Sequence, residues 1–251
     1  MDNNIDLKAI IFDKDGTLFN YASVWRQVIE DSIDEAFKNS NENRREKRKR
    51  NLIKLLGIDA DGNTIASGVI FSHNKYNITK KGIRYCITNL MFPSTLVKYT
   101  KEIMKYNNIF IEEKIKSMDF SKQRALFQKL KDLGYKIAVV TVDNRISADI
   151  FLKYMGIQEF VDYTVTKDDD IAQKPKPDSF IHFCNMFNLD PSQVAMVGDT
   201  ITDMKYAKNS NAGYKVGVLW GANDLAGLEK YADVIYPDIF YLLEDPIINK
   251  K

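Results

Sequence analysis

Short apolar runs that end in loops constrain the fold of this chain most strongly. Continuous apolar runs of this length are typical of strands buried on both faces of a parallel sheet. The clearest predicted strands are residues 9–12, 137–140, 194–197 and 216–219, and the weaker ones are 163–165 and 234–236.

Helical patterns lie between these strands from residue 121 onward. Ser121 is predicted to cap a helix that carries Leu126, Leu130 and Leu133 and ends at Gly134. The other predicted helices span residues 146–155, a stretch that begins at Pro177, and residues 202–212. The alternation of strand and helix predicts an α/β fold with a doubly wound, Rossmann-like parallel sheet.

A long stretch separates the first strand from the rest of the predicted sheet. Residues 21–115 are too long for a simple crossover and show a helical period, so we interpret them as an inserted helical domain. The core domain is then formed by residues 1–20 and 116–251. Hinges are expected at 14–22 and 112–120. Within the insertion, we predict helices at 23–39, 44–56 and 94–107, with loops over 57–68.

Composition excludes several classes of protein. The 251 residues carry a formal net charge of +2, are 45% hydrophobic and 28% charged, and contain two cysteines. These values argue against disorder, collagen, coiled coil and a disulfide framework. The polar start shows no secretory signal, and no apolar run approaches the roughly 20 residues needed to cross a bilayer. We therefore expect a cytoplasmic protein that does not act at a membrane.

The basic run from Arg44 to Arg50 is the strongest local charge feature. We interpret it as a solvated helix face, or as a positive surface that attracts anionic substrates. No aromatic platform accompanies it, so a nucleic-acid partner is not expected.

Polar residues follow the predicted strands at the edge where an open α/β sheet binds ligands. Residues 13–17 follow the first strand, Thr141 follows the second, and residues 198–203 follow another. Lys174 lies in a proline-containing loop before the helix that begins at Pro177. Their order along the chain predicts one shared site.

These motifs resemble those of the haloacid dehalogenase-like superfamily of aspartate-nucleophile phosphohydrolases. Residues 12–19 with Trp25, and residues 194–199, are similar to phosphoglycolate-phosphatase-like members. The resemblance covers residues 1–20 and 120–243. It implies that the insertion is the cap domain of the superfamily.

Two carboxylates of the first loop are the expected catalytic residues of such a phosphohydrolase. Asp13 is the expected nucleophile, which holds the phosphoryl group as an acyl phosphate. Asp15 is expected to protonate the leaving oxygen and later to accept a proton from water, which requires a raised pKa. Thr141 and Lys174 are expected to bind the phosphoryl oxygens.

Clustered carboxylates repel one another unless a cation joins them, and Asp13 with Asp199 suits Mg²⁺. The resemblance adds the backbone carbonyl of Asp15 as a metal ligand. Asp203, one helical turn after Asp199, is expected to orient the ligands from behind.

Three features depart from the pattern or extend it. Val142 stands where many relatives have Asn, so a side-chain contact with phosphate from that position is not expected. Phe19, Tyr21 and Trp25 lie where the chain leaves the core, and either pack at the hinge or contact the leaving group of the substrate. Lys14 is expected to have a structural role.

The predicted function is a Mg²⁺-dependent phosphatase acting on a small phosphorylated metabolite such as phosphoglycolate. A phosphomutase of the β-phosphoglucomutase type would use the same aspartates. A haloalkanoic-acid dehalogenase is disfavoured because that chemistry needs no second acid. The remaining alternative is a catalytically idle protein that binds a partner through its basic insertion.

Overall fold

The chain divides into two compact units. The computed structural model describes residues 5–39, 41–56, 82–87, 92–221 and 225–249. One unit is formed by Met1–Tyr21 and Asp119–Lys251, and the other by Ala22–Met118. That the second unit serves as a cap stays a prediction. Among the described residues, no helix has the length and apolar character needed to span a membrane.

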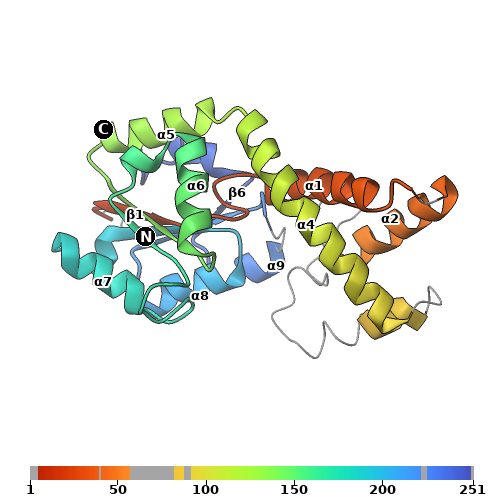
Figure 1. Ribbon diagram of the computed structural model, residues 1–251. Helices are drawn as coiled ribbons and strands as arrows, with labels where there is room; N and C mark the ends of the chain where they lie inside the picture. Colours follow the sequence, from red (N-terminus) through yellow and green to blue (C-terminus); the bar gives the residue numbers. More distant parts are fainter. Residues whose placement is uncertain (1–4, 40, 57–81, 88–91, 222–224, 250–251) are drawn as a thin grey trace. The chain divides into compact units, whose positions relative to one another are not determined.

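A parallel sheet of six strands forms the centre of the first unit (Figure 1), with the order β3-β2-β1-β4-β5-β6. All six predicted strands are confirmed, with ends that differ by at most two residues from the predicted ones. Strand β1 lies between β2 and β4, and its Phe12 is in register with Val139 and Val197. The strands are β1 Ala9–Phe12, β2 Lys136–Val140, β3 Tyr163–Val165, β4 Val194–Gly198, β5 Tyr214–Val218 and β6 Val234–Tyr236.

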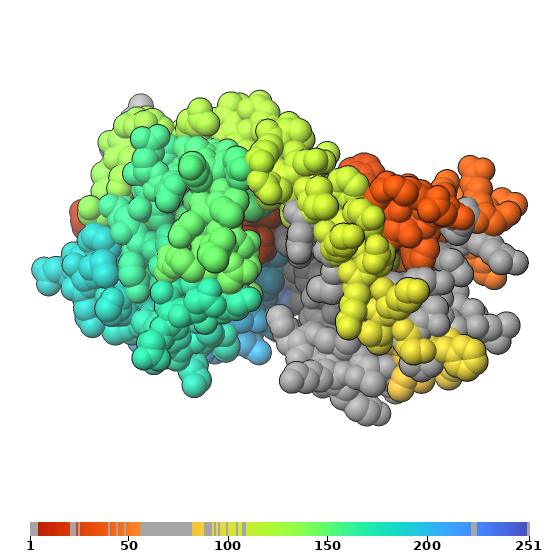
Figure 2. Space-filling view, viewed as in Figure 1, coloured from red at the N-terminus to blue at the C-terminus, as the bar shows by residue number. Residues whose placement is uncertain are grey.

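Helices cover both faces of this sheet, as a doubly wound fold requires. Helices α5 (Ser121–Asp132) and α6 (Arg145–Met155) lie on one face, and α7 (Asp178–Phe187) and α8 (Ile201–Asn209) on the other (Figure 1). Figure 2 shows that the green and cyan segments, which contain α6 and α7, form most of the visible surface of this unit.

Both faces of the sheet are buried, which explains why the strands are continuously apolar. On the α7 and α8 side, Ile11 and Met196 belong to one buried cluster with Phe180, Phe183 and others. On the opposite side, the ring of Phe12 lies 5.1 Å from that of Phe127 in α5. The shorter elements of this unit are η1 Gln158–Phe160, η2 Pro191–Gln193, α9 Leu225–Leu228 and η3 Ile239–Leu243.

The helix ends follow local capping chemistry, and one predicted cap is wrong. Ser121 is the first residue of α5 rather than its cap, and its backbone N–H donates to the Asp119 carboxylate at 2.9 Å. Gly156 ends α6 in the left-handed conformation, with φ of 65°, directly after the predicted helix end at residue 155. Helix α7 begins directly after Pro177, also as predicted.

Helices α1 (Tyr21–Ala36), α2 (Glu42–Leu56) and α4 (Pro93–Ser117) belong to the second unit. Ile33, Leu52 and Ile103 share its buried core with other apolar residues. Helix α4 has 25 residues, so most of the hinge expected at 112–120 is helical, and the predicted end at 107 is wrong. The turn of the chain comes only after Ser117, because apolar residues such as the buried Ile115 continue the helical pattern. The loops predicted at 57–68 lie outside the described residues.

The basic run lies on α2, where part of it is paired. Lys49 Nζ lies 2.6 Å from Asp34 Oδ2 of α1, and Arg45 Nε lies 3.5 Å from Asp34 Oδ1. Lys47 and Arg50 are exposed. This arrangement is that of a solvated helix face with ion pairs to a neighbouring helix.

A buried carboxylate fastens the C-terminal segment to the sheet. Asp245 Oδ2 accepts hydrogen bonds from the hydroxyls of Tyr214 and Tyr236, both at 2.9 Å. Its Oδ1 accepts from the backbone N–H groups of Ile247 and Ile248 at 2.7 and 3.1 Å. One side chain therefore satisfies four donors.

Replacing this carboxylate tests how much it contributes. We expect Asp245→Ala to lower the free energy of unfolding by about 3 kcal/mol, because buried donors lose their acceptor. The control Asp132→Ala, at an exposed residue of α5, should change it by less than about 0.5 kcal/mol. Chemical denaturation measures both, and equal losses in the two variants would contradict the assignment.

Candidate active site

Three adjacent strands deliver the predicted site residues to one edge of the sheet. Asp13 directly follows β1, Thr141 follows β2, and Asp199 follows β4. The backbone N–H of Asp13 donates to Val197 O at 2.9 Å, and that of Thr141 donates to Val165 O at 2.9 Å. The sheet ladder therefore continues up to these residues and fixes their backbone positions.

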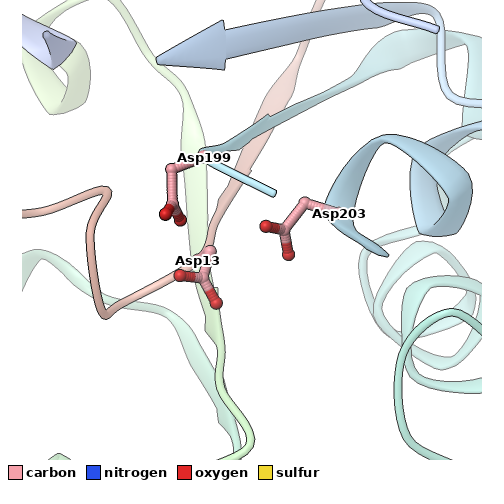
Figure 3. Close-up of side chains that lie close together, drawn as sticks. All are labelled: Asp13, Asp199 and Asp203. Carbon is pink, nitrogen blue, oxygen red and sulfur yellow. The ribbon is translucent and has the colours of Figure 1, made fainter. Parts of the chain in front are cut away.

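The carboxylates of Asp13, Asp199 and Asp203 converge in this place (Figure 3). One oxygen from each lies within 4.8 Å of the other two. All three residues are buried, with whole-residue exposures of 8%, 2% and 1%. Buried carboxylates this close together require cations or hydrogen-bond donors.

Lys174 supplies one positive charge to this cluster. Its Nζ lies 2.5 Å from Asp13 Oδ1 and 2.7 Å from Asp203 Oδ1. The lysine comes from the loop between β3 and α7, and its side chain is only 4% exposed. It is the predicted phosphate-binding cation, and the structure places it directly at the predicted nucleophile.

Burial and charge act in opposite directions on this pair. Burial raises the pKa of Asp13 to about 7; the Lys174 ammonium opposes the rise, and the Asp203 carboxylate adds to it. Burial alone would lower the pKa of Lys174, but the Asp13 and Asp203 carboxylates outweigh burial and raise that pKa. The ion pair favours the charged form of both groups, and burial prevails only at Asp13.

Local hydrogen bonds hold Asp203 in the cluster. Thr200 caps α8, and its side chain and that of Asp203 form reciprocal hydrogen bonds to each other's backbone N–H. Asp203 Oδ2 also accepts from the Thr200 hydroxyl at 2.5 Å. Capping thus turns the other oxygen, Oδ1, toward Lys174.

Residues from the loops after β1 and β5 surround the Asp199 carboxylate. The Thr17 hydroxyl donates to Asp199 Oδ1 at 3.1 Å. Gly16, with φ of 84°, and Gly221 approach the same carboxylate so closely that a Cβ on either would collide with it. Glycine at both positions therefore leaves room for the Asp199 carboxylate.

A divalent cation fits the chemistry of this donor set. Carboxylate oxygens are the ligands that hard cations prefer. Lys174 contacts Asp13 and Asp203, but its one positive charge would not balance the three carboxylates if all of them were ionised. Asp13, Asp199 and Asp203 are the residues that could hold such an ion. That Asp203 orients the ligands from behind stays a prediction; one of its carboxylate oxygens lies within 4.8 Å of oxygens of Asp13 and Asp199, so it could also be a ligand itself.

The Asp15 carboxylate does not belong to this cluster. Its Oδ1 accepts from Lys14 Nζ at 2.6 Å, and the side chain is 32% exposed. Thr141 is buried, and its hydroxyl accepts from the backbone N–H of Asp143 at 3.1 Å. Val142, the residue that departs from the family pattern, is exposed.

The three aromatic residues after the first loop have different outcomes. Phe19 is buried, and its ring lies 4.4 Å from that of Phe151. This contact agrees with the packing alternative for Phe19. Tyr21 and Trp25 lie on α1, but their side chains lie outside the described residues. A contact between these two side chains and substrate therefore stays a prediction.

Asp143 is a residue of this region that lies outside the predicted site residues. Its Oδ2 lies 3.3 Å from Lys14 Nζ and accepts from the Ser147 hydroxyl at 2.6 Å. One sequence signal points to Asp143: it lies two residues after Thr141 and directly after Val142, the residue that differs from the family pattern.

Comparison with known proteins identifies the family. A sequence model of the haloacid dehalogenase-like hydrolases matches residues 7–211, and the chain belongs to this hydrolase family. The resemblance seen in the motifs is thereby confirmed.

Individual relatives extend this comparison. The chain is 36% identical over 118 residues to the pyrophosphatase PpaX of Bacillus velezensis, which covers 43% of this chain and 54% of the relative. The match to PpaX of Bacillus cereus is 35% over 105 residues, 41% of this chain and 48% of the relative. The chain thus spans about half the length of these curated relatives.

Solved structures of the same fold cover nearly the whole chain. One is described as a predicted phosphoglycolate phosphatase from Haemophilus somnus, with TM-score 0.64, 22% identity, and 95% of this chain and 97% of that chain covered. Another, from Thermotoga maritima, is provisionally described as a beta-phosphoglucomutase, with TM-score 0.64, 17% identity and 97% of both chains covered. At these identities the likeness shows the fold.

The raised pKa of Asp13 predicts how stability depends on pH when metal is removed. Between about pH 4 and pH 7 the folded protein holds the Asp13 proton more tightly than the unfolded chain, so wild-type stability falls as pH rises. Asp13→Asn removes this decrease. The stability of the variant relative to wild type should therefore rise from about pH 5 to pH 8 in EDTA.

Denaturation at the two pH values measures this difference. The control is Asp162→Asn: burial opposes the shift, but hydrogen bonds from Lys131 and the Ile137 N–H lower the pKa of Asp162 below its ordinary value. Asp162 loses its stabilising contribution only in more acidic solution. Asp162→Asn should therefore change the free energy of unfolding by the same amount at pH 5 and pH 8. A relative stability of Asp13→Asn that falls with pH would contradict the assignment.

Proposed function

We propose that this hydrolase is a Mg²⁺-dependent phosphatase that releases phosphate from a small phosphorylated metabolite through an aspartyl phosphate at Asp13. The observation that carries the proposal is the pair of contacts that places buried Lys174 against Asp13 and Asp203, beside Asp199. Membership of the hydrolase family and the phosphatase names of several relatives support it.

The reaction has two steps that balance in atoms and charge. A carboxylate oxygen of Asp13 attacks phosphorus, the bond from phosphorus to the leaving oxygen breaks, and Asp15 donates its proton to that oxygen. A water oxygen then attacks the same phosphorus. Asp15 takes the water proton, the bond from phosphorus to the Asp13 oxygen breaks, and phosphate leaves.

The other residues bind and stabilise the transferred group. Lys174 offers positive charge to the phosphoryl oxygens, and Thr141 offers its hydroxyl. Asp13 and Asp199 would hold Mg²⁺ with the backbone carbonyl of Asp15, and the place of Asp203 in the cluster makes it a further candidate ligand. When bound, Mg²⁺ neutralises the charge that develops on the phosphoryl oxygens.

The preferred substrate class is a small phosphomonoester, such as phosphoglycolate. Pyrophosphate is the second candidate because the PpaX relatives are named pyrophosphatases. A phosphomutase would keep the same aspartates and return the phosphoryl group to a sugar.

A phosphate-release assay with p-nitrophenyl phosphate and Mg²⁺ tests the chemistry. We expect wild-type turnover that EDTA abolishes, and Asp13→Asn should lower it by at least about 10³-fold because the nucleophile is lost. The matched control Asp162→Asn removes a carboxylate that binds Lys131 and Lys136 instead, and should retain activity. Substantial turnover by Asp13→Asn would exclude Asp13 as nucleophile.

A metabolite panel separates the three outcomes for substrate. We expect phosphate release to be fastest from a small phosphomonoester, with no isomerised sugar phosphate formed. Faster release from pyrophosphate would replace the phosphomonoester assignment. An isomerised sugar phosphate without free phosphate would instead identify a phosphomutase. A protein that releases phosphate from nothing in the panel and retains nucleic acid in a salt-dependent manner would be the idle binding protein.

A further inference from the structure

Lys14 is a charged residue buried in the first loop, between the predicted nucleophile and the predicted acid. Its side chain is only 2% exposed. Lysine is almost never fully buried unless its ammonium group is paired. The adjacent Asp13 carboxylate is paired with Lys174. The burial of Lys14 is therefore explained by contacts with other groups.

Two carboxylates and an aromatic ring surround the Lys14 ammonium group. Its Nζ lies 2.6 Å from Asp15 Oδ1 and 3.3 Å from Asp143 Oδ2. It also lies 4.6 Å from the centre of the Phe151 ring, which packs on Phe19. These contacts hold the ammonium group from several directions.

Asp143 is itself fixed, so it anchors Lys14. Its Oδ2 accepts from the Ser147 hydroxyl at 2.6 Å, and its Oδ1 accepts from the backbone N–H of Asn144 at 2.8 Å. Its backbone N–H donates to the Thr141 hydroxyl at 3.1 Å. The Lys14–Asp143 contact therefore joins the loop that carries Asp13 and Asp15 to the loop that carries Thr141.

We propose that Lys14 is a positioning residue that, anchored by Asp143, holds the Asp15 carboxylate where it exchanges a proton with the leaving oxygen. This inference rests on the proposed phosphatase function. The Asp15 side chain is partly exposed and would otherwise sample several rotamers. An anchored ammonium group at 2.6 Å restricts it to one, and such restriction is what proton transfer in the transition state requires.

The dependence of rate on the leaving group separates positioning from a merely structural role. An alkyl phosphate needs its leaving oxygen protonated, whereas p-nitrophenolate leaves readily without a proton. The quantity to compare is kcat/KM, which reports transfer of the phosphoryl group to Asp13 and not the later hydrolysis. The assay uses the full chain with Mg²⁺, glycerol phosphate and p-nitrophenyl phosphate.

We expect Lys14→Met to lower kcat/KM at least about tenfold more for glycerol phosphate than for p-nitrophenyl phosphate. Asp15→Asn should show the same selectivity with a larger loss, and the double variant should lose little more than Asp15→Asn alone. The control Lys136→Met replaces a half-exposed lysine paired with Asp162, and it should leave kcat/KM unchanged for both substrates.

The outcomes distinguish this inference from the function on which it rests. Failure of the wild-type protein to release phosphate from either substrate would overturn the phosphatase assignment and this role with it. An active wild type with equal losses for both substrates in Lys14→Met would overturn the role of Lys14 alone. If Lys14→Met does not fold, Asp143→Asn replaces it: a selective loss on glycerol phosphate supports the role, and an equal loss on both substrates overturns it.

Discussion

The buried ion pair between Lys174 and the aspartates Asp13 and Asp203 is the interaction on which the site depends. Three carboxylates within 4.8 Å of one another would repel strongly in a buried place. The Lys174 ammonium group contacts the Asp13 carboxylate directly and reduces this repulsion. In the proposed mechanism it also offers a positive charge to the phosphoryl group, so the same residue serves both the fold and the proposed chemistry.

The sheet makes this convergence possible. Strand β1 lies between β2 and β4, and the three are parallel, so the loops that follow them meet at one edge. The apolar strands are buried on both faces, so the polar residues of the site lie in the loops that follow the strands. Glycines at 16 and 221 then allow two loops to approach Asp199 closely.

Much of the core was predictable because its signals are local. Strands such as β1 and β4 are apolar runs buried on both faces, and α6 ends directly before Gly156, where its predicted range also ends. The motifs that follow the strands indicated the family. The end of α4 was missed because consecutive asparagines at 107 and 108 weaken the helical pattern, although the apolar residues beyond them continue it.

The contacts within the site were less predictable than its residues. Which oxygen of Asp203 faces Lys174 depends on the capping of α8 by Thr200, and the Lys14–Asp143 pair joins residues 129 positions apart. Neither follows from spacing along the chain. The most direct test of the account is mass spectrometry of the protein after acid quenching during turnover with a phosphomonoester and Mg²⁺. The account predicts one phosphoryl group on the peptide that contains Asp13; turnover with the phosphoryl group on another residue, or on none, would contradict it.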